Sequence, residues 1–260
     1  MYDDVRYDTD GGIATITIDR PEVKNAFRRQ TILELNAALR DAREDEGVYV
    51  VVLTGADDGF CAGADVSTMP DWSGEMTYED YAGYLWGVQN VVRQLRGMSK
   101  PSIAGVGGPA VGAGCDFALA CDLRVVGPNA LLREGFVKVG LVPGDGGAWL
   151  LPRLVGEAKA REYLLTGRDI TPEDCVDLGL AVEEREDPLA GAVALAEEIL
   201  ALPALAVRRT NDLVDPEQSF EEYCERAIDY QWDCVNDEEH SEAIAAFSEK
   251  RAPEYDRDYS

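Results

Sequence analysis

Two turns rich in small residues could do chemistry through their backbone. Residues 60–66 (Phe-Cys-Ala-Gly-Ala-Asp-Val) and 108–116 (Gly-Pro-Ala-Val-Gly-Ala-Gly-Cys-Asp) each follow a predicted strand. The second also leads into a predicted helix, whose first N–H groups lack intrahelical acceptors and attract negative charge. Small side chains let the backbone approach a ligand closely, although residues 60–66 alone could equally be a tightly packed loop. Two such turns predict paired N–H donors, an oxyanion hole that stabilises charge developing on oxygen.

Other ligand-binding motifs fit these residues poorly. A dinucleotide-binding fingerprint would need a glycine three residues after Gly114, where Phe117 stands. The chain has no Gly-Lys-Ser/Thr phosphate-binding loop. Its one histidine is His240, and its six cysteines include no C-x-x-C pair, so we expect no metal site.

Alternating strands and helices must position the two turns. Apolar runs and alternation predict strands at residues 13–19, 48–54, 102–106 and 123–126. Helical spacing predicts helices at residues 31–46, 78–95 and 115–120, and this alternation indicates α/β layers. After Pro188 the pattern is helical only, at residues 189–202, 204–213, 220–234 and 238–251. We therefore divide the chain into a core of residues 1–200 and a helical region of residues 201–260.

The charge balance narrows the partners and the environment. The 260 residues carry 50 Asp and Glu against 24 Lys and Arg, a net charge of -26 that would repel nucleic acid and anionic membranes. Such a surface suits a cytoplasm at molar salt, although an acidic mesophilic protein is the alternative. No apolar run reaches the ~18 residues of a membrane helix, and the first residues do not resemble a signal peptide. We therefore expect a cytoplasmic protein with buried, reduced thiols.

Over nearly its whole length the chain resembles the crotonase superfamily, the enoyl-CoA hydratase/isomerase family. The similar segments occur in the family's order, at residues 14–27, 60–66, 101–124, 140–147, 166–182 and 246–251. The resemblance implies an α/β fold, a crotonase-like ββα spiral whose helical C-terminal region mediates assembly into trimers or hexamers. It also implies an acyl-CoA substrate and no metal or redox cofactor.

The resemblance assigns roles to backbone and side chains. The oxyanion donors would be the N–H groups of Ala64 and Ala113. Coenzyme A would contact the loop at residues 23–24, the turn of residues 60–66 and, from a neighbouring subunit, the last helix. A solvated helix face is the simpler interpretation of the lysine in that helix. These residues are Val23, Lys24, Ala62, Asp65, Val66, Phe247 and Lys250.

The family's catalytic acid and base are only partly matched by residues of this chain. Hydratases of the family use two glutamates, which fall here on Asp116 and Phe136. Asp145 and Glu134 could replace the second, or could be a turn and a surface carboxylate. Glu134 would share the face of Phe136 on a strand but not on a helix. Because Asp116 lies near a helix N-terminus, we expect it to be ionised and to act as a base, with Asp145 as the acid and Glu134 in reserve.

Three functions follow from this pattern. The first is an enoyl-CoA hydratase, a lyase that adds water to a 2-enoyl-CoA through a stabilised enolate. The second is an enoyl-CoA or epoxyacyl-CoA isomerase, because one carboxylate suffices to shuttle one proton. The third is a non-catalytic acyl-CoA-binding or scaffold subunit.

The charge predicts a strong response to salt. Repulsion among 50 acidic residues is unscreened in dilute buffer, whereas the Debye length falls to about 3 Å at 1 M salt. The melting temperature should therefore rise with KCl up to molar concentrations, as scanning calorimetry would measure. A melting temperature that is the same in dilute buffer and in molar KCl would remove the halophilic interpretation.

Overall fold

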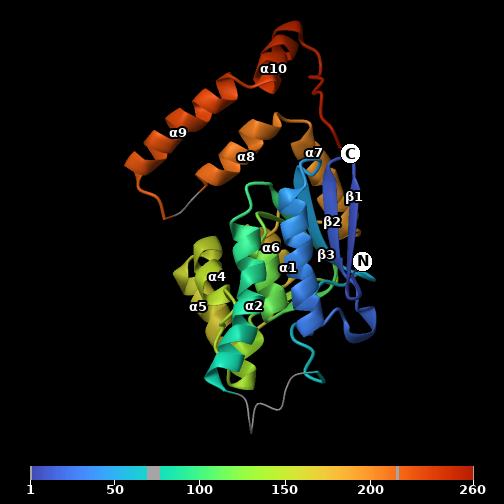
Figure 1. The fold of residues 1–260 in the computed structure, drawn as a ribbon. Helices are drawn as coiled ribbons and strands as arrows, with labels where there is room; N and C mark the ends of the chain where they lie inside the picture. Colours follow the sequence, from blue (N-terminus) through green and yellow to red (C-terminus); the bar gives the residue numbers. More distant parts are fainter. Residues whose placement is uncertain (1, 69–76, 215–216, 260) are drawn as a thin grey trace.

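A six-stranded sheet forms the centre of the computed structural model, which describes residues 2–68, 77–214 and 217–259 (Figure 1). β1 runs antiparallel to β2, and every later pair in the order β1-β2-β3-β4-β6-β8 is parallel. Parallel neighbours need a crossover, which the intervening helices supply. The strands are β1 Val5–Asp10, β2 Ile13–Ile18, β3 Val50–Gly55, β4 Ser102–Val106, β6 Leu123–Val126 and β8 Glu183–Glu184.

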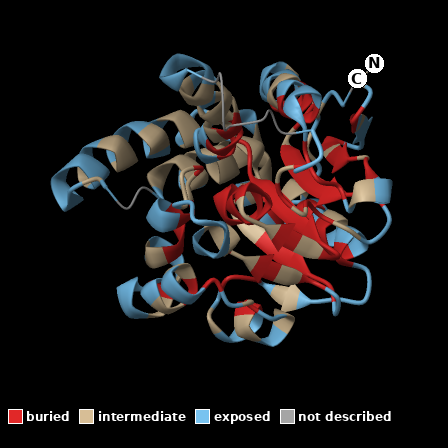
Figure 2. Cartoon of the chain, turned by 90° about the horizontal axis from the view of Figure 1, so that it is seen from below, coloured by how far each residue is buried: buried red, intermediate tan, exposed pale blue. Residues whose placement is uncertain are grey.

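Helices cover both faces of this sheet, which makes its central strands hydrophobic throughout. α1 Arg29–Glu44, α2 Tyr78–Arg96 and α3 Ala113–Ala120 pack on one face, and α7 Pro188–Leu200 packs on the other. Along β3, Val51 and Leu53 belong to the first core, and Val50 and Val52 to the second. β3, β4 and α3 are buried at every residue, as the red centre of Figure 2 shows. The predicted α/β layering is therefore confirmed.

A small second sheet carries the Gly-rich turn. It pairs β5 Pro109–Val111 in parallel with β7 Leu131–Arg133, and β5 is separated from α3 by Gly112 alone. Short helices complete this part of the chain. They are η1 Pro21–Val23, η2 Gly135–Val139, α4 Gly147–Val155, α5 Glu157–Thr166 and α6 Pro172–Asp177.

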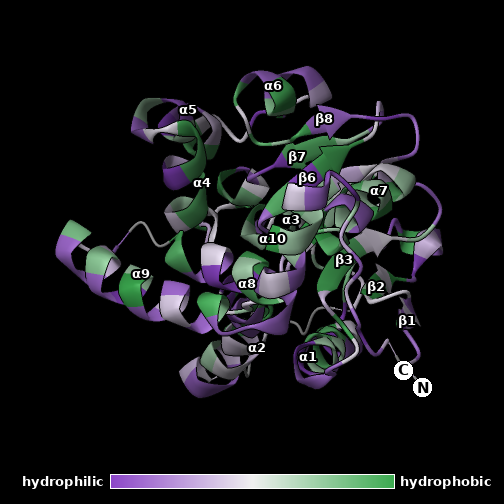
Figure 3. Ribbon diagram, turned by 90° about the horizontal axis from the view of Figure 1, so that it is seen from above, coloured by the Kyte–Doolittle hydropathy of each residue, from purple (hydrophilic) through white to green (hydrophobic). Residues whose placement is uncertain are grey.

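Three helices extend from the layered body as a C-terminal arm. They are α8 Ala204–Leu213, α9 Phe220–Val235 and α10 Glu238–Glu249, which Figure 1 shows beyond one end of the sheet. α8 and α9 contain no buried residue, and green hydrophobic and purple hydrophilic stretches of the ribbon alternate along α9 in Figure 3. Within the described residues, no single helix is long and apolar enough to cross a membrane, although the sharply bent pair of α7 and α8 meets those criteria together.

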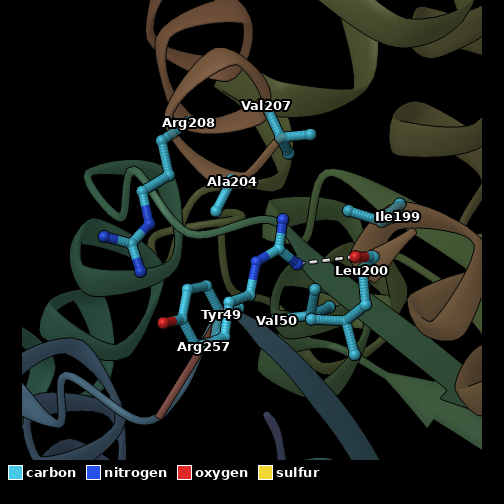
Figure 4. A pocket seen from close by; sticks show the side chains of 8 residues that line it. All are labelled: Tyr49, Val50, Ile199, Leu200, Ala204, Val207, Arg208 and Arg257. Atoms are coloured by element: carbon cyan, nitrogen blue, oxygen red, sulfur yellow. Dashed lines mark hydrogen bonds between the residues drawn. The ribbon is translucent and has the colours of Figure 1, made fainter. Parts of the chain in front are cut away.

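The last residues tie the arm to the sheet. Arg257 donates hydrogen bonds to the carbonyl oxygen of Leu200 (2.6 Å) and to the carboxylate of Glu239 on α10. The ring of Tyr259 meets that of Tyr49 edge-on, with centroids 5.7 Å apart. Figure 4 shows Arg257 crossing a small pocket between the start of β3 and the end of α7. The tail therefore fixes where the arm leaves the body.

The two Gly-rich turns touch at positions that only glycine can occupy. A Cβ atom on Gly114 would lie 2.1 Å from the carbonyl oxygen of Cys61, and one on Gly63 would lie 2.8 Å from that of Val111. Gly63 also has φ +94°, a conformation that other residues rarely adopt. The backbones of residues 61–63 and 111–114 are therefore in direct contact.

Two glycine-to-alanine substitutions should have opposite effects on stability. Gly114→Ala forces Cβ against a backbone oxygen and should cost about 1–3 kcal/mol, the usual cost of overpacking. Gly83→Ala, in the middle of α2 with no atom near its Cβ, should stabilise by about 0.5–1 kcal/mol, since it only removes backbone freedom. Chemical denaturation in molar KCl measures both. Equal stabilities for the two variants would contradict the close approach of the turns.

Candidate active site

Two backbone N–H groups are free where the turns meet. Hydrogen bonds from Phe27 to Gly63 and from Asp65 to Phe27, both 2.8 Å, hold the backbone on either side of Ala64. α3 begins at Ala113, two residues earlier than predicted, so the Ala113 amide occupies the first helical position and has no intrahelical acceptor. Among the described residues, neither amide has a hydrogen-bond acceptor. Both can therefore receive an anionic oxygen.

A short ladder keeps these amides together. The Cys61 amide donates to Pro109, and the Val111 amide donates to Cys61, each at 3.0 Å. Ala64 lies three residues after Cys61, and Ala113 lies two residues after Val111. The turn of residues 60–66 thus runs beside β5, and the two predicted oxyanion donors follow paired segments.

Three buried carboxyl groups gather next to this turn. Asp116 on α3 is 0% exposed, Glu134 just before η2 is 1% exposed, and Asp145 before α4 is 7% exposed. Among the described residues, no donor meets hydrogen-bond geometry at either oxygen of Asp116 or Glu134, or at Oδ1 of Asp145. Glu134 belongs to neither a strand nor a long helix, so the sequence could not place its side chain.

Gly147 is the point where two of these carboxyl groups meet. A Cβ atom there would lie 2.4 Å from Oε2 of Glu134 and 2.5 Å from Oδ1 of Asp116. The absence of a side chain at the first residue of α4 thus leaves room for both acids. Sequence patterns could not predict this pairing, because Asp116, Glu134 and Gly147 belong to three separate segments.

Burial makes all three acids bind protons more tightly than usual. It raises the pKa of Asp116 well above its ordinary value, and the charges of Glu134 and then Asp145 raise it further. Burial, with a smaller contribution from Asp145, raises the pKa of Glu134 to about 7. Burial also raises the pKa of Asp145 to about 6.

The expectation that Asp116 is readily ionised is therefore wrong. A helix N-terminus stabilises a negative charge by roughly 0.3–1 kcal/mol, up to about 2. Burying an uncompensated carboxylate costs several kcal/mol. In the part of the chain that the structure describes, no group of three or more His, Cys, Asp or Glu side chains is arranged to hold a metal ion that could offset this cost. Retention of a proton removes the charge and with it this cost.

Phe136 replaces a carboxylate with an apolar surface. It occupies η2, and a Cβ atom on Gly112 would lie 3.4 Å from Cζ of its ring. Gly112 immediately precedes the free amide of Ala113. The aromatic ring therefore covers one side of the turn that carries the Ala113 amide.

The loops expected to bind coenzyme A are joined to each other. The Ala62 amide donates to the Lys24 carbonyl oxygen (3.1 Å), which connects the loop at residues 23–24 to the turn of residues 60–66. Val23 is half-buried, and Lys24 and Val66 are exposed. These four residues therefore belong to one connected surface.

Asp65 has a structural partner that the sequence did not reveal. Its carboxylate accepts from the Ser67 hydroxyl (2.6 Å) and pairs with the buried Arg20 guanidinium (3.0 Å). Ser67 and then Arg20 hold the pKa of Asp65 below its ordinary value. Arg20 also donates to the Ala26 carbonyl oxygen. The Asp65 side chain thus anchors the turn of residues 60–66 to the loop of residues 20–26.

Phe247 and Lys250 lie apart from these loops in the same chain. Phe247 is 85% exposed on α10, and Lys250 ends that helix in a left-handed conformation. α10 packs against α9 and not against the sheet, as Figure 1 shows.

The chain is similar to known proteins along almost its full length. The model of the enoyl-CoA hydratase/isomerase family matches residues 8–258. A probable enoyl-CoA hydratase of Mycobacterium tuberculosis is 39% identical over 207 residues, 78% of each chain. A crotonyl-CoA hydratase of Syntrophomonas wolfei is 33% identical over 257 residues, 96% of each chain.

A solved structure agrees with these sequence likenesses. The crystal structure of an enoyl-CoA hydratase from Mycobacterium smegmatis has a TM-score of 0.89 and 31% identity, and covers 97% of this chain and 99% of that one. With this shared fold and a family match over nearly every residue, the protein belongs to the enoyl-CoA hydratase/isomerase family, the crotonase superfamily.

Proposed function

We propose that the protein is an enoyl-CoA hydratase that adds water across the C2–C3 double bond of a 2-enoyl-CoA. The free amides of Ala64 and Ala113, beside a buried cluster of carboxyl groups, carry this proposal. The amides would hold the thioester oxygen as it becomes an enolate, and the acids would handle the protons. The substrate is a coenzyme A thioester, and no further cofactor takes part.

The catalytic acids are Asp116 and one or both of Glu134 and Asp145. Asp116 lies one turn into the helix that begins at the Ala113 donor, which favours its contact with the reacting carbons. Coenzyme A would lie along the joined loops. Its contacts there are Val23, Lys24, Ala62, Val66 and the backbone at Asp65.

A homotrimer, or a hexamer made of two trimers, completes the site. Ile228, Trp232 and Phe247 expose 70%, 68% and 85% of their surface on α9 and α10, which leaves large apolar side chains of the arm uncovered in a single chain. Burying this arm against a second copy would bring Phe247 and Lys250 to a neighbour's coenzyme A. The net charge opposes nucleic-acid and membrane partners and suits a cytoplasmic enzyme.

The oxyanion role can be tested at one backbone atom. Ala113→Pro removes the N–H at the first helical position, where proline is tolerated, and should lower the hydration rate of crotonyl-CoA by about 10²–10³. Ala113→Gly keeps the N–H and should retain activity. Absorbance of the enoyl thioester follows the reaction, and circular dichroism checks folding. Comparable rates for the two folded variants would remove this role from Ala113.

An isomerase is the second candidate, and Phe136 is the observation that favours it. Its ring places an apolar surface at the oxyanion turn, where a group that handles water would otherwise be expected. The products from crotonyl-CoA, a 3-enoyl-CoA and an arylacetyl epoxide-CoA distinguish the candidates. A hydroxyacyl product from the first supports the hydratase, and turnover of the others alone supports the isomerase. No turnover of any would indicate a binding subunit.

The assembly can be measured directly. Light scattering in molar KCl should give a mass three or six times that of the 28.4 kDa chain. Replacing exposed apolar residues of the arm, as in Trp232→Glu with Ile228→Glu, should release monomers, because unpaired charges would be buried at the interface. A wild-type monomer would contradict the proposed assembly.

A further inference from the structure

The two acids that meet at Gly147 are in an unusual electrostatic position. Asp116 and Glu134 are at most 1% exposed, and no donor among the described residues meets hydrogen-bond geometry at their oxygens, although the nearby Gly147 amide lowers the pKa of Asp116 and the Cys115 thiol lowers that of Glu134. Two carboxylates this close cannot both ionise without severe repulsion, so one proton is retained between them. The groups that face them are Asp145, which adds a further negative charge, and the Cys115 thiol on α3. Tyr84 on α2 faces Asp145.

We propose that Asp116 and Glu134 form a single acid–base unit that holds one shared proton and supplies both the acid and the base of the reaction. This inference rests on the proposed hydratase function and identifies the second carboxylate as Glu134. Asp145 is the less suitable partner, since the three atoms nearest to the Gly147 Cβ position all belong to Glu134 and Asp116. Its part is to strengthen the retention of the proton through its charge.

One shared proton balances the addition of water. A water oxygen bonds to C3 while the ionised member of the pair takes one of its protons. The C2–C3 π electrons then move through C1 onto the thioester oxygen, which the two amides hold as an enolate. The enolate re-forms its carbonyl as C2 takes a proton from the pair, which by then carries two. The pair ends with one proton, as it began, and the product is a 3-hydroxyacyl thioester.

This arrangement supplies chemistry that an isolated carboxyl group cannot. At a given moment, a single group is either an acid or a base, whereas a pair with one proton is both. The protons leave such a pair in two macroscopic steps that belong to the unit and not to either residue. Glu134 therefore performs, from another position in the sequence, the part that Phe136 cannot.

Kinetics of four variants test the unit. Wild-type kcat/KM for crotonyl-CoA should be bell-shaped in pH, because activity needs one proton on the pair. Asp116→Asn and Glu134→Gln should each lower kcat by at least about 10², and residual activity of Glu134→Gln should keep only one limb of the bell. The control Glu197→Gln removes an exposed charge on α7 and should leave rate and profile unchanged. Asp145→Asn should keep the bell and move it to lower pH.

Stability provides a test that does not depend on turnover. A group whose folded pKa is raised contributes stability below its unfolded pKa and loses that contribution as pH rises through the folded pKa. Raising the pH from about 4.5 to about 8 should therefore move the denaturation midpoint of Glu134→Gln upward relative to wild type and to Glu197→Gln.

The two tests separate failure of the unit from failure of the proposed function. If wild type hydrates crotonyl-CoA while Glu134→Gln retains its rate and full bell, the shared proton is wrong and the hydratase stands. If wild type does not hydrate crotonyl-CoA, the proposed hydratase function is wrong. The stability comparison then still tests the proposed pair of Asp116 and Glu134. Parallel midpoints for Glu134→Gln and Glu197→Gln across this pH range would overturn it.

Discussion

Two backbone segments of this molecule lie in direct contact, and the candidate site is arranged around that contact. Gly114 passes so near the Cys61 carbonyl oxygen that no side chain fits between them. That contact joins the turn after β3 to the start of α3, and therefore the Ala64 amide to the Ala113 amide. Glycine and alanine fill both turns because larger side chains would hold the two backbones, and with them the Ala64 and Ala113 amides, apart.

A second constraint on the site is the burial of carboxyl groups away from water, where a negative charge is costly. The chain carries most of its acids on its surface, where salt can screen them. Asp116, Glu134 and Asp145 are instead buried together, and burial raises the pKa of each. Gly147 makes room for two of them, as Gly114 makes room for the turns. Glycine at these two positions thus brings together amides that favour anions and acids that retain a proton.

The sequence predicted the parts whose signal is local. β4, β6 and α8 have the predicted bounds, because apolar runs and helical spacing report burial directly. β5 and β7 were missed, since three residues show no alternation and their pairing joins separate segments. β1 was missed because it is an edge strand with mostly exposed polar residues. The resemblance gave the positions of Ala64, Ala113 and Asp116, but the contact between Asp116 and Glu134 and the anchor from Arg20 to Asp65 depend on tertiary structure.

A crystal structure with a bound acyl-CoA, such as acetoacetyl-CoA in molar KCl, tests the central claim most directly. The thioester oxygen should lie about 2.7–3.1 Å from the amide nitrogens of both Ala64 and Ala113, the usual distance in an oxyanion hole. The C2 and C3 atoms of the acyl group should face the carboxyl groups of Asp116 and Glu134. A thioester held away from either amide, or an acyl chain turned away from both acids, would contradict it.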